Sequence, residues 1–296
     1  MAPARRGAPD LECVANVSEG RAVDVLDRLA AACGDVLVDL HRDPGHHRAV
    51  LTLAGAGPEV EEGVRALAVA TVERLDLSGH EGSHPRLGVL DVVPFVPIEA
   101  PRQGRPFGPP ADLGRAVMAR DRFCAWAGRT LGLPCFRYGP LPEGGERSLP
   151  AVRREAFRAL APDTGPPEPH PTAGACAVGA RGFLVAYNLW LADRPEAGAL
   201  AVARSVAAAV RGPAVRALGL DVEGRAQVSC NLVDPFSVGP AEVYDQVSEL
   251  AAAAGGAIES AELVGLVPAA VLDAVPPDRW EPLGLSRSAT LEERLA

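Results

Sequence analysis

The sequence contains no lysine, and all 29 of its basic side chains apart from histidine are arginines. A Schiff-base mechanism, a pyridoxal-phosphate site and a phosphate-binding P-loop each require a lysine amine. The missing residue type therefore excludes all three kinds of site. Arginine remains available as a planar, permanently charged partner that binds carboxylates through two parallel hydrogen bonds.

Long apolar runs are also absent. The chain has no stretch of about 18 apolar residues, so the sequence predicts no membrane-spanning helix. Residues 1–7 lack the apolar centre of a signal peptide. The net charge of −9 disfavours nucleic acids and anionic membranes, because both bind basic surfaces. Small molecules are the expected partners, with no nucleic acid and no membrane.

Cysteine is scarce and scattered. Six cysteines occur without a C-x-x-C pair, and most of them stand inside apolar runs. A reduced cysteine in such a run behaves as a small hydrophobic residue. The pattern indicates a reducing compartment, and we expect a cytoplasmic protein.

The chain divides into two halves with the same order of predicted elements. Short apolar runs predict strands in the first half over 11–17, 36–40, 49–54 and 87–96. Apolar residues at helical spacing predict one helix opening at Ser18 and ending near Gly34, and a second from Pro58 to Leu75. A further helix over about 111–131 and a short strand over 134–138 complete this half.

The second half repeats the order. We expect strands over 183–191, 215–222, 226–233 and 257–264, and helices over 199–210 and 243–254. This βαββαβ order is the split-βαβ arrangement of a ferredoxin-like sandwich. The predicted class is therefore α+β, an α/β sandwich of two ferredoxin-like subdomains, 1–180 and 181–296, with a cleft between them. By composition alone, the proline-rich segment 161–174 is a linker between the halves.

Five of the six histidines fall in two predicted loops, 41–48 and 80–86, namely His41, His46, His47, His80 and His84. Histidine suits proton transfer near neutral pH because its free pKa is about 6.5. Each loop also holds an arginine, Arg48 or Arg86, that could bind a carboxylate beside the base. One such loop alone would be a solvated loop; two together indicate a site for acid–base chemistry.

Other kinds of site fit the sequence less well. His80 and His84 have the i, i+4 spacing of metal ligands, and Asp43 could add an oxygen, but that spacing converges best on a helix. Glycine and proline residues interrupt any helix at 79–85, so we expect no bound metal. The serine-hydrolase motif G-x-S-x-G is absent, and 179–182 does not match the dinucleotide-binding motif G-x-G-x-x-G.

Four segments carry a resemblance to a known family. They are L-E-C-V-A-N-V-S-E-G at 11–20, H-P-R-L-G-V-L-D-V-V-P-F-V-P at 84–97, A-Q-V-S-C-N-L at 226–232 and E-L-V-G-L-V-P at 262–268. In this order, from about residue 11 to about residue 275, the chain resembles glutamate formiminotransferase. The resemblance is to the transferase domain alone, without a deaminase domain.

The resemblance implies transfer of a formimino group between N-formiminoglutamate and tetrahydrofolate, a step of histidine degradation and one-carbon metabolism. It implies that His84 is the catalytic base and acid and that tetrahydrofolate is the co-substrate. The residues that match the family's folate-contacting loop are Gly165, Pro166, Pro167, Glu168, Pro169, His170, Pro171, Thr172, Ala173 and Gly174. The candidates for binding substrate carboxylates are Asp43, Arg48, Arg86 and Arg181. A homodimer is compatible with these expectations.

Two positions depart from the family. Ser83 stands where the family often has glutamate, and His47 stands where it often has asparagine. A carboxylate beside the base would orient it and raise its pKa. Another amine acceptor, a formyl donor in place of a formimino donor, and a non-catalytic folate-binding protein therefore remain alternatives. The presence of His84 followed by Pro85 and Arg86 favours an enzyme.

Overall fold

The computed structural model describes residues 8–82, 85–99, 106–192 and 198–296. The chain forms two compact units. The first contains the described residues of 1–100 and 110–181, and the second contains 106–109 and the described residues of 182–294. Across these described ranges, no helix is both long enough and apolar enough to cross a membrane.

The first unit contains seven strands and four α-helices in its described part. Its strands are β1 (Leu11–Val17), β2 (Leu37–Asp43), β3 (Arg48–Gly55), β4 (Leu90–Pro97), β5 (Cys135–Pro140), β6 (Glu146–Arg147) and β7 (Cys176–Ala180). Its helices are α1 (Val23–Cys33), α2 (Gly57–Arg74), α3 (Gly114–Thr130) and α4 (Leu149–Glu155), with a 3-10 turn, η1, at Gly34–Val36.

These strands form one sheet in the order β2-β3-β1-β4-β7-β5-β6. The first four strands pair antiparallel and follow the βαββαβ order, so the predicted ferredoxin-like arrangement is confirmed here. Strand β7 extends the sheet by pairing parallel with β4 on one side and with β5 on the other. The first sheet is therefore mixed and larger than the sequence predicts.

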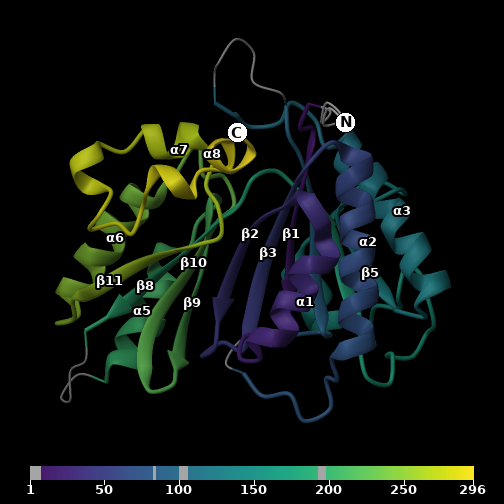
Figure 1. Cartoon of the computed structure of the whole chain (residues 1–296). Helices are drawn as coiled ribbons and strands as arrows, with labels where there is room; N and C mark the ends of the chain where they lie inside the picture. Colours follow the sequence, from purple (N-terminus) through teal and green to yellow (C-terminus); the bar gives the residue numbers. More distant parts are fainter. Residues whose placement is uncertain (1–7, 83–84, 100–105, 193–197) are drawn as a thin grey trace. The chain divides into compact units, whose positions relative to one another are not determined.

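Buried and partly exposed side chains alternate along β1, which shows on which face of the sheet the core lies. In β1, Leu11, Cys13, Ala15 and Val17 are fully buried and pack against α1, α2 and α3, which cover this face of the sheet (Figure 1). On the other face β1 carries Glu12 and Asn16, whereas near β5 and β7 a second, smaller apolar cluster packs beneath α4 through Val152. Period-2 alternation is thus clear in β1, and it is lost where both faces of the sheet are covered.

The structure corrects several boundaries. Helix α1 begins at Val23, and Ser18 belongs to the connection before it, where its hydroxyl donates to the carbonyl of Gly88, two residues before β4 (2.9 Å). His41 lies in β2, whose strand continues through Asp43. The sequence missed β6, α4 and β7. Strand β7 is a five-residue run of small, fully buried residues, which has no alternation to reveal a strand.

The proline-rich segment 161–174 is not a linker between the two units. It lies inside the first unit and precedes β7, a central strand of the first sheet. The Cys135 N–H donates to the Thr164 carbonyl (2.9 Å), and the Val89 N–H donates to the Ala173 carbonyl (3.0 Å). The interpretation from composition was wrong, because proline marks irregular backbone whether or not that backbone is packed.

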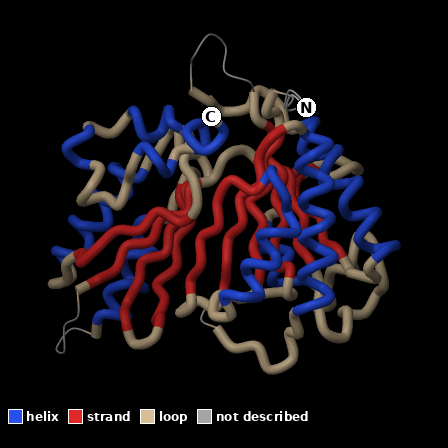
Figure 2. Tube along the Cα trace, in the orientation of Figure 1, coloured by secondary structure: helices blue, strands red, loops and turns tan. Residues whose placement is uncertain are grey.

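The second unit repeats the ferredoxin-like order without an extension. Its elements are β8 (Val185–Leu191), α5 (Ala199–Val210), β9 (Val215–Val222), β10 (Arg225–Leu232), α6 (Pro240–Ala253) and β11 (Ile258–Val264), followed by α7 (Ala269–Asp273), the 3-10 turns η3 (Pro277–Arg279) and η4 (Arg287–Ala289), and α8 (Leu291–Leu295). The four strands are antiparallel in the order β11-β8-β10-β9 (Figure 2). The α+β class with two sheet subdomains is thus confirmed.

The core of the second unit lies between its sheet and its helices. Side chains of α5 and α6, such as Val206 and Val247, pack against Val228 and Leu189 of the strands. The Tyr187 hydroxyl donates to the Leu283 carbonyl (2.7 Å), which ties the C-terminal segment to β8. All six cysteines are buried thiols, and burial raises the pKa of Cys33 and of Cys230 to about 12.

Candidate active site

A buried carboxylate joins the elements that surround the histidine loops. Asp91, near the start of β4, has a fully buried side chain. Its Oδ2 accepts from Arg48 of β3 (2.8 Å) and from Arg153 of α4 (2.7 Å), and its Oδ1 accepts from the Leu87 N–H (2.7 Å). Arg153 also donates to the Pro85 carbonyl (2.9 Å). One carboxylate thereby fixes two strands, one helix and the end of the 80–86 loop.

The charges of this cluster compensate one another. Burial would raise the pKa of Asp91, but Arg48, Arg153 and the Leu87 N–H hold that pKa below its ordinary value. Burial lowers the pKa of Arg48, and Asp91 opposes the shift. Arg48 is further oriented by Asn16 of β1, whose Oδ1 accepts from its Nε (3.0 Å) and from its Nη2 (2.8 Å). The guanidinium is thus fixed in position.

Two glycines of the resemblance segments occupy positions where a side chain would collide with backbone. A Cβ on Gly20, after β1, would lie 2.2 Å from the Asp43 carbonyl oxygen. A Cβ on Gly88, after the 80–86 loop, would lie 2.2 Å from the Ala175 carbonyl oxygen. These close approaches pack the β1–α1 connection onto the β2–β3 turn and the end of the 80–86 loop onto 173–175.

The β2–β3 turn brings Asp43, His46 and His47 together. The Asp43 carboxylate accepts from the His46 N–H (2.8 Å) and from the His46 ring, and His46 is buried. Burial would raise the pKa of Asp43, but His46 holds it below its ordinary value. Arg86 donates to the carbonyls of His46 (3.3 Å) and His47 (3.5 Å). The predicted residues Asp43 and Arg86 therefore meet at this turn, and Arg48 begins the strand that follows it.

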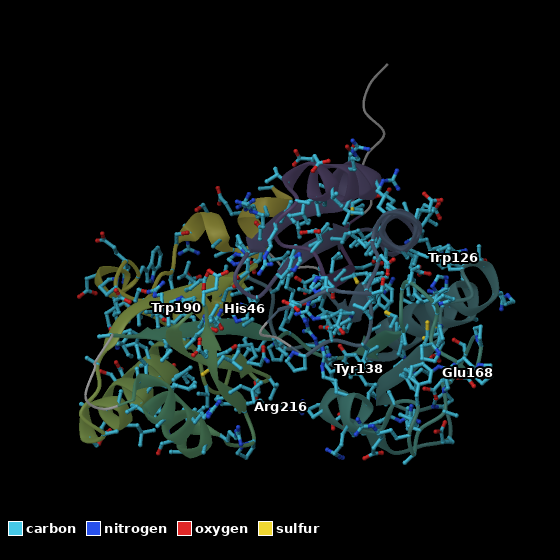
Figure 3. The ribbon with its side chains drawn as sticks, turned by 90° about the horizontal axis from the view of Figure 1, so that it is seen from below. His46, Trp126, Tyr138, Glu168, Trp190 and Arg216 are labelled. Atoms are coloured by element: carbon cyan, nitrogen blue, oxygen red, sulfur yellow. The ribbon has the colours of Figure 1, made fainter. Side chains whose placement is uncertain are left out.

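The predicted folate loop is joined to the same site by its backbone. The Leu77 N–H donates to the Thr172 carbonyl (2.7 Å), and the Ala175 N–H donates to the Leu87 carbonyl (3.0 Å). The loop starts elsewhere, at Gly165 against α3, and Glu168 is exposed far from His46 (Figure 3). The predicted folate loop thus ends beside Leu77 and Leu87, which flank the 80–86 loop.

Within this loop, His170 has a defined tautomer. Its Nδ1 accepts from the Ala173 N–H (3.0 Å) and from the Thr172 N–H (3.3 Å), so Nδ1 carries no hydrogen. The hydrogen of the neutral ring is therefore on Nε2, which can donate to an oxygen or nitrogen of a ligand. An antiparallel bridge between His170 and Gly174 closes this turn. The turn thus presents one ring N–H donor, at Nε2.

Arg181 lies apart from this cluster. Arg181 follows β7, and its N–H donates to the Phe95 carbonyl (3.1 Å) near the far end of β4. Four residues of strand, about 13 Å, separate Phe95 from Asp91. The Arg181 side chain forms a hydrogen bond with the side chain of Tyr138, which is labelled in Figure 3. His84, the expected catalytic base, and the neighbouring Ser83 lie outside the described residues.

Sequence reasoning missed Asp91, Arg153 and Asn16 as parts of the site. Asp91 stands in the D-V-V-P-F-V-P segment and Asn16 in L-E-C-V-A-N-V-S-E-G, so both were visible in the resemblance but had no assigned role. Arg153 had no signal, because its helix was not predicted. In the described ranges, no group of three or more histidine, cysteine, aspartate or glutamate side chains is placed to hold a metal ion.

Comparison with known proteins gives consistent results. The family model described as the formiminotransferase domain, N-terminal subdomain, matches residues 11–181. The chain is 32% identical to glutamate formimidoyltransferase of Streptococcus pyogenes serotype M1 over 283 residues, 88% of this chain and 90% of that protein. It is 30% identical to the protein of the same name from Thermoplasma acidophilum, with 87% and 88% covered.

A longer relative matches over part of its length. The chain is 34% identical to formimidoyltransferase-cyclodeaminase of Sus scrofa over 287 residues, and it spans about half of that protein's length (51%). The fold and the site define an α+β protein in which a histidine-bearing turn rests on an arginine–carboxylate cluster. The chain belongs to the formiminotransferase family.

Proposed function

We propose that the protein is a glutamate formimidoyltransferase, which moves a formimino group between N-formiminoglutamate and tetrahydrofolate. The similarity to glutamate formimidoyltransferases along nearly the whole of both chains carries this proposal. The geometry supports this proposal. The Thr172 and Ala173 carbonyls of the proposed folate loop accept hydrogen bonds from the N–H groups of Leu77 and Val89, which lie before and after the 80–86 loop. A folate held by 165–174 would thus lie next to a histidine-bearing loop.

The chemistry requires one group that both accepts and returns a proton. An amine of tetrahydrofolate attacks the formimino carbon, and a tetrahedral intermediate forms with a new C–N bond. The attacking nitrogen then loses a proton, and the glutamate nitrogen gains one as its own C–N bond breaks. We assign both transfers to His84, since one imidazole can act as base and then as acid, typically contributing about 10²–10⁴-fold to the rate.

The remaining candidates bind and orient. Arg86 and Arg48 lie beside the β2–β3 turn and provide guanidinium groups for carboxylates of the amino acid. Asp43 is engaged by His46, so we assign it to shaping that turn. Arg181 lies near Phe95 and would contact only a part of the substrates distant from Asp91. Residues 165–174 would hold the folate, with His170 donating through Nε2.

Several further assignments go with this function. We propose that residues 1–180 and 181–296 act as the N-terminal and C-terminal formiminotransferase subdomains. A cytoplasmic location suits the six buried thiols, since reduced cysteines persist in a reducing compartment. A homodimer is proposed as the form in which the enzyme works.

The test is a direct assay. The protein is incubated with tetrahydrofolate and N-formiminoglutamate, and formation of 5-formiminotetrahydrofolate is followed through the change in the folate absorption spectrum. We expect product only when both substrates and the protein are present. N-formylglutamate and formimino derivatives of other amino acids, tested in parallel, separate the proposed reaction from transfer with another donor. Tight folate binding without turnover on any of them would overturn the proposal in favour of a folate-binding protein.

A further inference from the structure

One segment of the resemblance has no role in the proposed mechanism. It is A-Q-V-S-C-N-L at 226–232, which forms most of β10, an inner strand of the second sheet. Alternate residues of this segment, beginning with Ala226, are buried in the core of the second unit, on the face that α5 and α6 cover. Alternation along the strand therefore turns Gln227 to the opposite face of the sheet.

Gln227 is fully buried (0% exposed) although it lies on this opposite face. Within the described part of the chain, neither Oε1 nor Nε2 of its carboxamide has a hydrogen-bond partner. Exchanging the two atoms would change nothing, because both are unpaired. Buried amides normally make their hydrogen bonds, since an unpaired polar group loses its contacts with water and gains none in return. The side chain therefore calls for a partner from outside the chain.

The neighbouring side chains on that face cannot supply the missing partner. Directly across the sheet, Gln227 pairs with Trp190 of β8, which is labelled in Figure 3, and with Leu220 of β9. Leucine has no polar group. The single donor of Trp190, its Nε1, lies 3.3 Å from Oε2 of Glu262. The guanidinium of Arg225 lies over the Trp190 ring, 4.5 Å from its centroid, as in a cation–π contact.

A carboxamide selects a particular kind of ligand group. It presents an acceptor oxygen beside an N–H donor in one plane. It therefore forms two parallel hydrogen bonds with a planar group that places an N–H beside an acceptor, as glutamine does with the amino group and ring nitrogen of adenine. A carboxylate offers no donor, and a trans amide points its N–H and C=O in opposite directions. The matching group is an aminopyrimidine or a lactam in a ring.

We propose that Gln227 is a ligand-binding residue whose carboxamide pairs with the aminopyrimidinone edge of the pterin ring of tetrahydrofolate. The choice of ligand rests on the proposed function. Of its two substrates, only tetrahydrofolate has such an edge, because a protonated formimino group presents donors alone. Trp190 and Leu220 are only partly buried, and the pterin reaches the carboxamide by displacing their side chains.

The first experiment observes the carboxamide directly and needs no turnover. In a 1H–15N NMR spectrum the two protons on Nε2 of Gln227 give a pair of signals, which is assigned by its loss in Gln227→Met. Tetrahydrofolate alone, without a formimino donor, should shift this pair. Tetrahydropterin should shift it as well, whereas p-aminobenzoylglutamate, the remainder of the folate, should not. An unshifted pair at saturating tetrahydrofolate would overturn the proposal.

The second experiment compares stability with affinity. Gln227→Met nearly keeps the size of the side chain and removes both unpaired polar atoms. The Tm of the free protein should therefore rise, by about 4 °C or more. The Kd for tetrahydrofolate should rise by about 5- to 150-fold, the change expected from the loss of two neutral hydrogen bonds. Gln246→Met, at an exposed position of α6 in the same unit, is the matched control and should alter neither quantity.

A simultaneous gain in stability and loss of affinity is what a purely structural glutamine would not produce. A Gln227→Met variant that binds tetrahydrofolate as the parent does would overturn the proposal, whether its Tm rises or falls, since the amide would then hold a buried water or nothing. If this variant does not fold, sequential assignment of the signal pair in the parent protein leaves the NMR experiment decisive.

The outcomes also separate this contact from the proposed function. A protein without transferase activity whose Gln227 signals respond to tetrahydrofolate and to tetrahydropterin would refute the function and retain the contact. An active transferase whose Gln227 signals do not respond would refute the contact and retain the function.

Discussion

Substitution of Asp91 by asparagine tests whether the site rests on one buried charge. The change keeps the size of the side chain but removes a fully buried carboxylate that accepts from Arg48, Arg153 and the Leu87 N–H. The two guanidinium groups are only 14% and 16% exposed, so they would be left without their buried counter-charge. Breaking a buried ion pair on one side costs about 3–5 kcal/mol.

The measurement is thermal unfolding of the full chain. For a unit of this size, that cost should lower Tm by about 6–20 °C. Asp245→Asn is the matched control, since Asp245 also accepts two hydrogen bonds from one arginine, Arg279, but both side chains are exposed (57% and 37%). An exposed pair contributes at most about 1 kcal/mol, so this control should lower Tm by less than about 4 °C.

The pH dependence gives a second check. The folded pKa of Asp91 lies below its ordinary value, which is about 3.9 in the unfolded chain. The stabilisation from its charge is therefore complete above that pH and is lost as the pH falls through the lower, folded pKa. The difference in stability between the parent and Asp91→Asn should be constant near neutrality and should shrink below about pH 4. A variant no less stable than Asp245→Asn would refute this reasoning.

Three further predictions concern function. His84→Ala should lower kcat by about 10²–10⁴-fold while the folate Kd changes little, because a general base acts mainly in the transition state. Near-normal turnover would mean that His84 is not the base and that the base lies in the β2–β3 turn instead. Saturating tetrahydrofolate should protect the amides of 165–174 from hydrogen exchange, and unchanged exchange there would mean that the loop does not bind it. His170→Asn, which removes the Nε2 donor, should raise the Kd for folate by about 2- to 12-fold, the change expected from the loss of one neutral hydrogen bond. An unaltered Kd measured by fluorescence titration would exclude that contact.

Local patterns in the sequence determined much of the fold. Strands β1, β3 and β9 and helix α5 were predicted nearly residue for residue, because each carries its own alternation or helical spacing on a chain that buries one face. The repeated βαββαβ order then followed from their succession. The absence of lysine and the two histidine-bearing segments narrowed the possible chemistry by residue type alone, since neither depends on how the chain folds.

Only the tertiary structure determined which of these elements pair and which distant side chains meet. Strand β7 has no period because both of its faces are buried, so its place between β4 and β5 depends on neighbours far away in the chain. From its composition, 161–174 was interpreted as a linker. In the structure, backbone hydrogen bonds from Leu77 and Val89 hold the end of this segment beside the residues that flank the 80–86 loop. Asp91 gains its role only when β3 and α4 bring two arginines to it, since a carboxylate's pairing depends on what folding places beside it and not on its sequence neighbours.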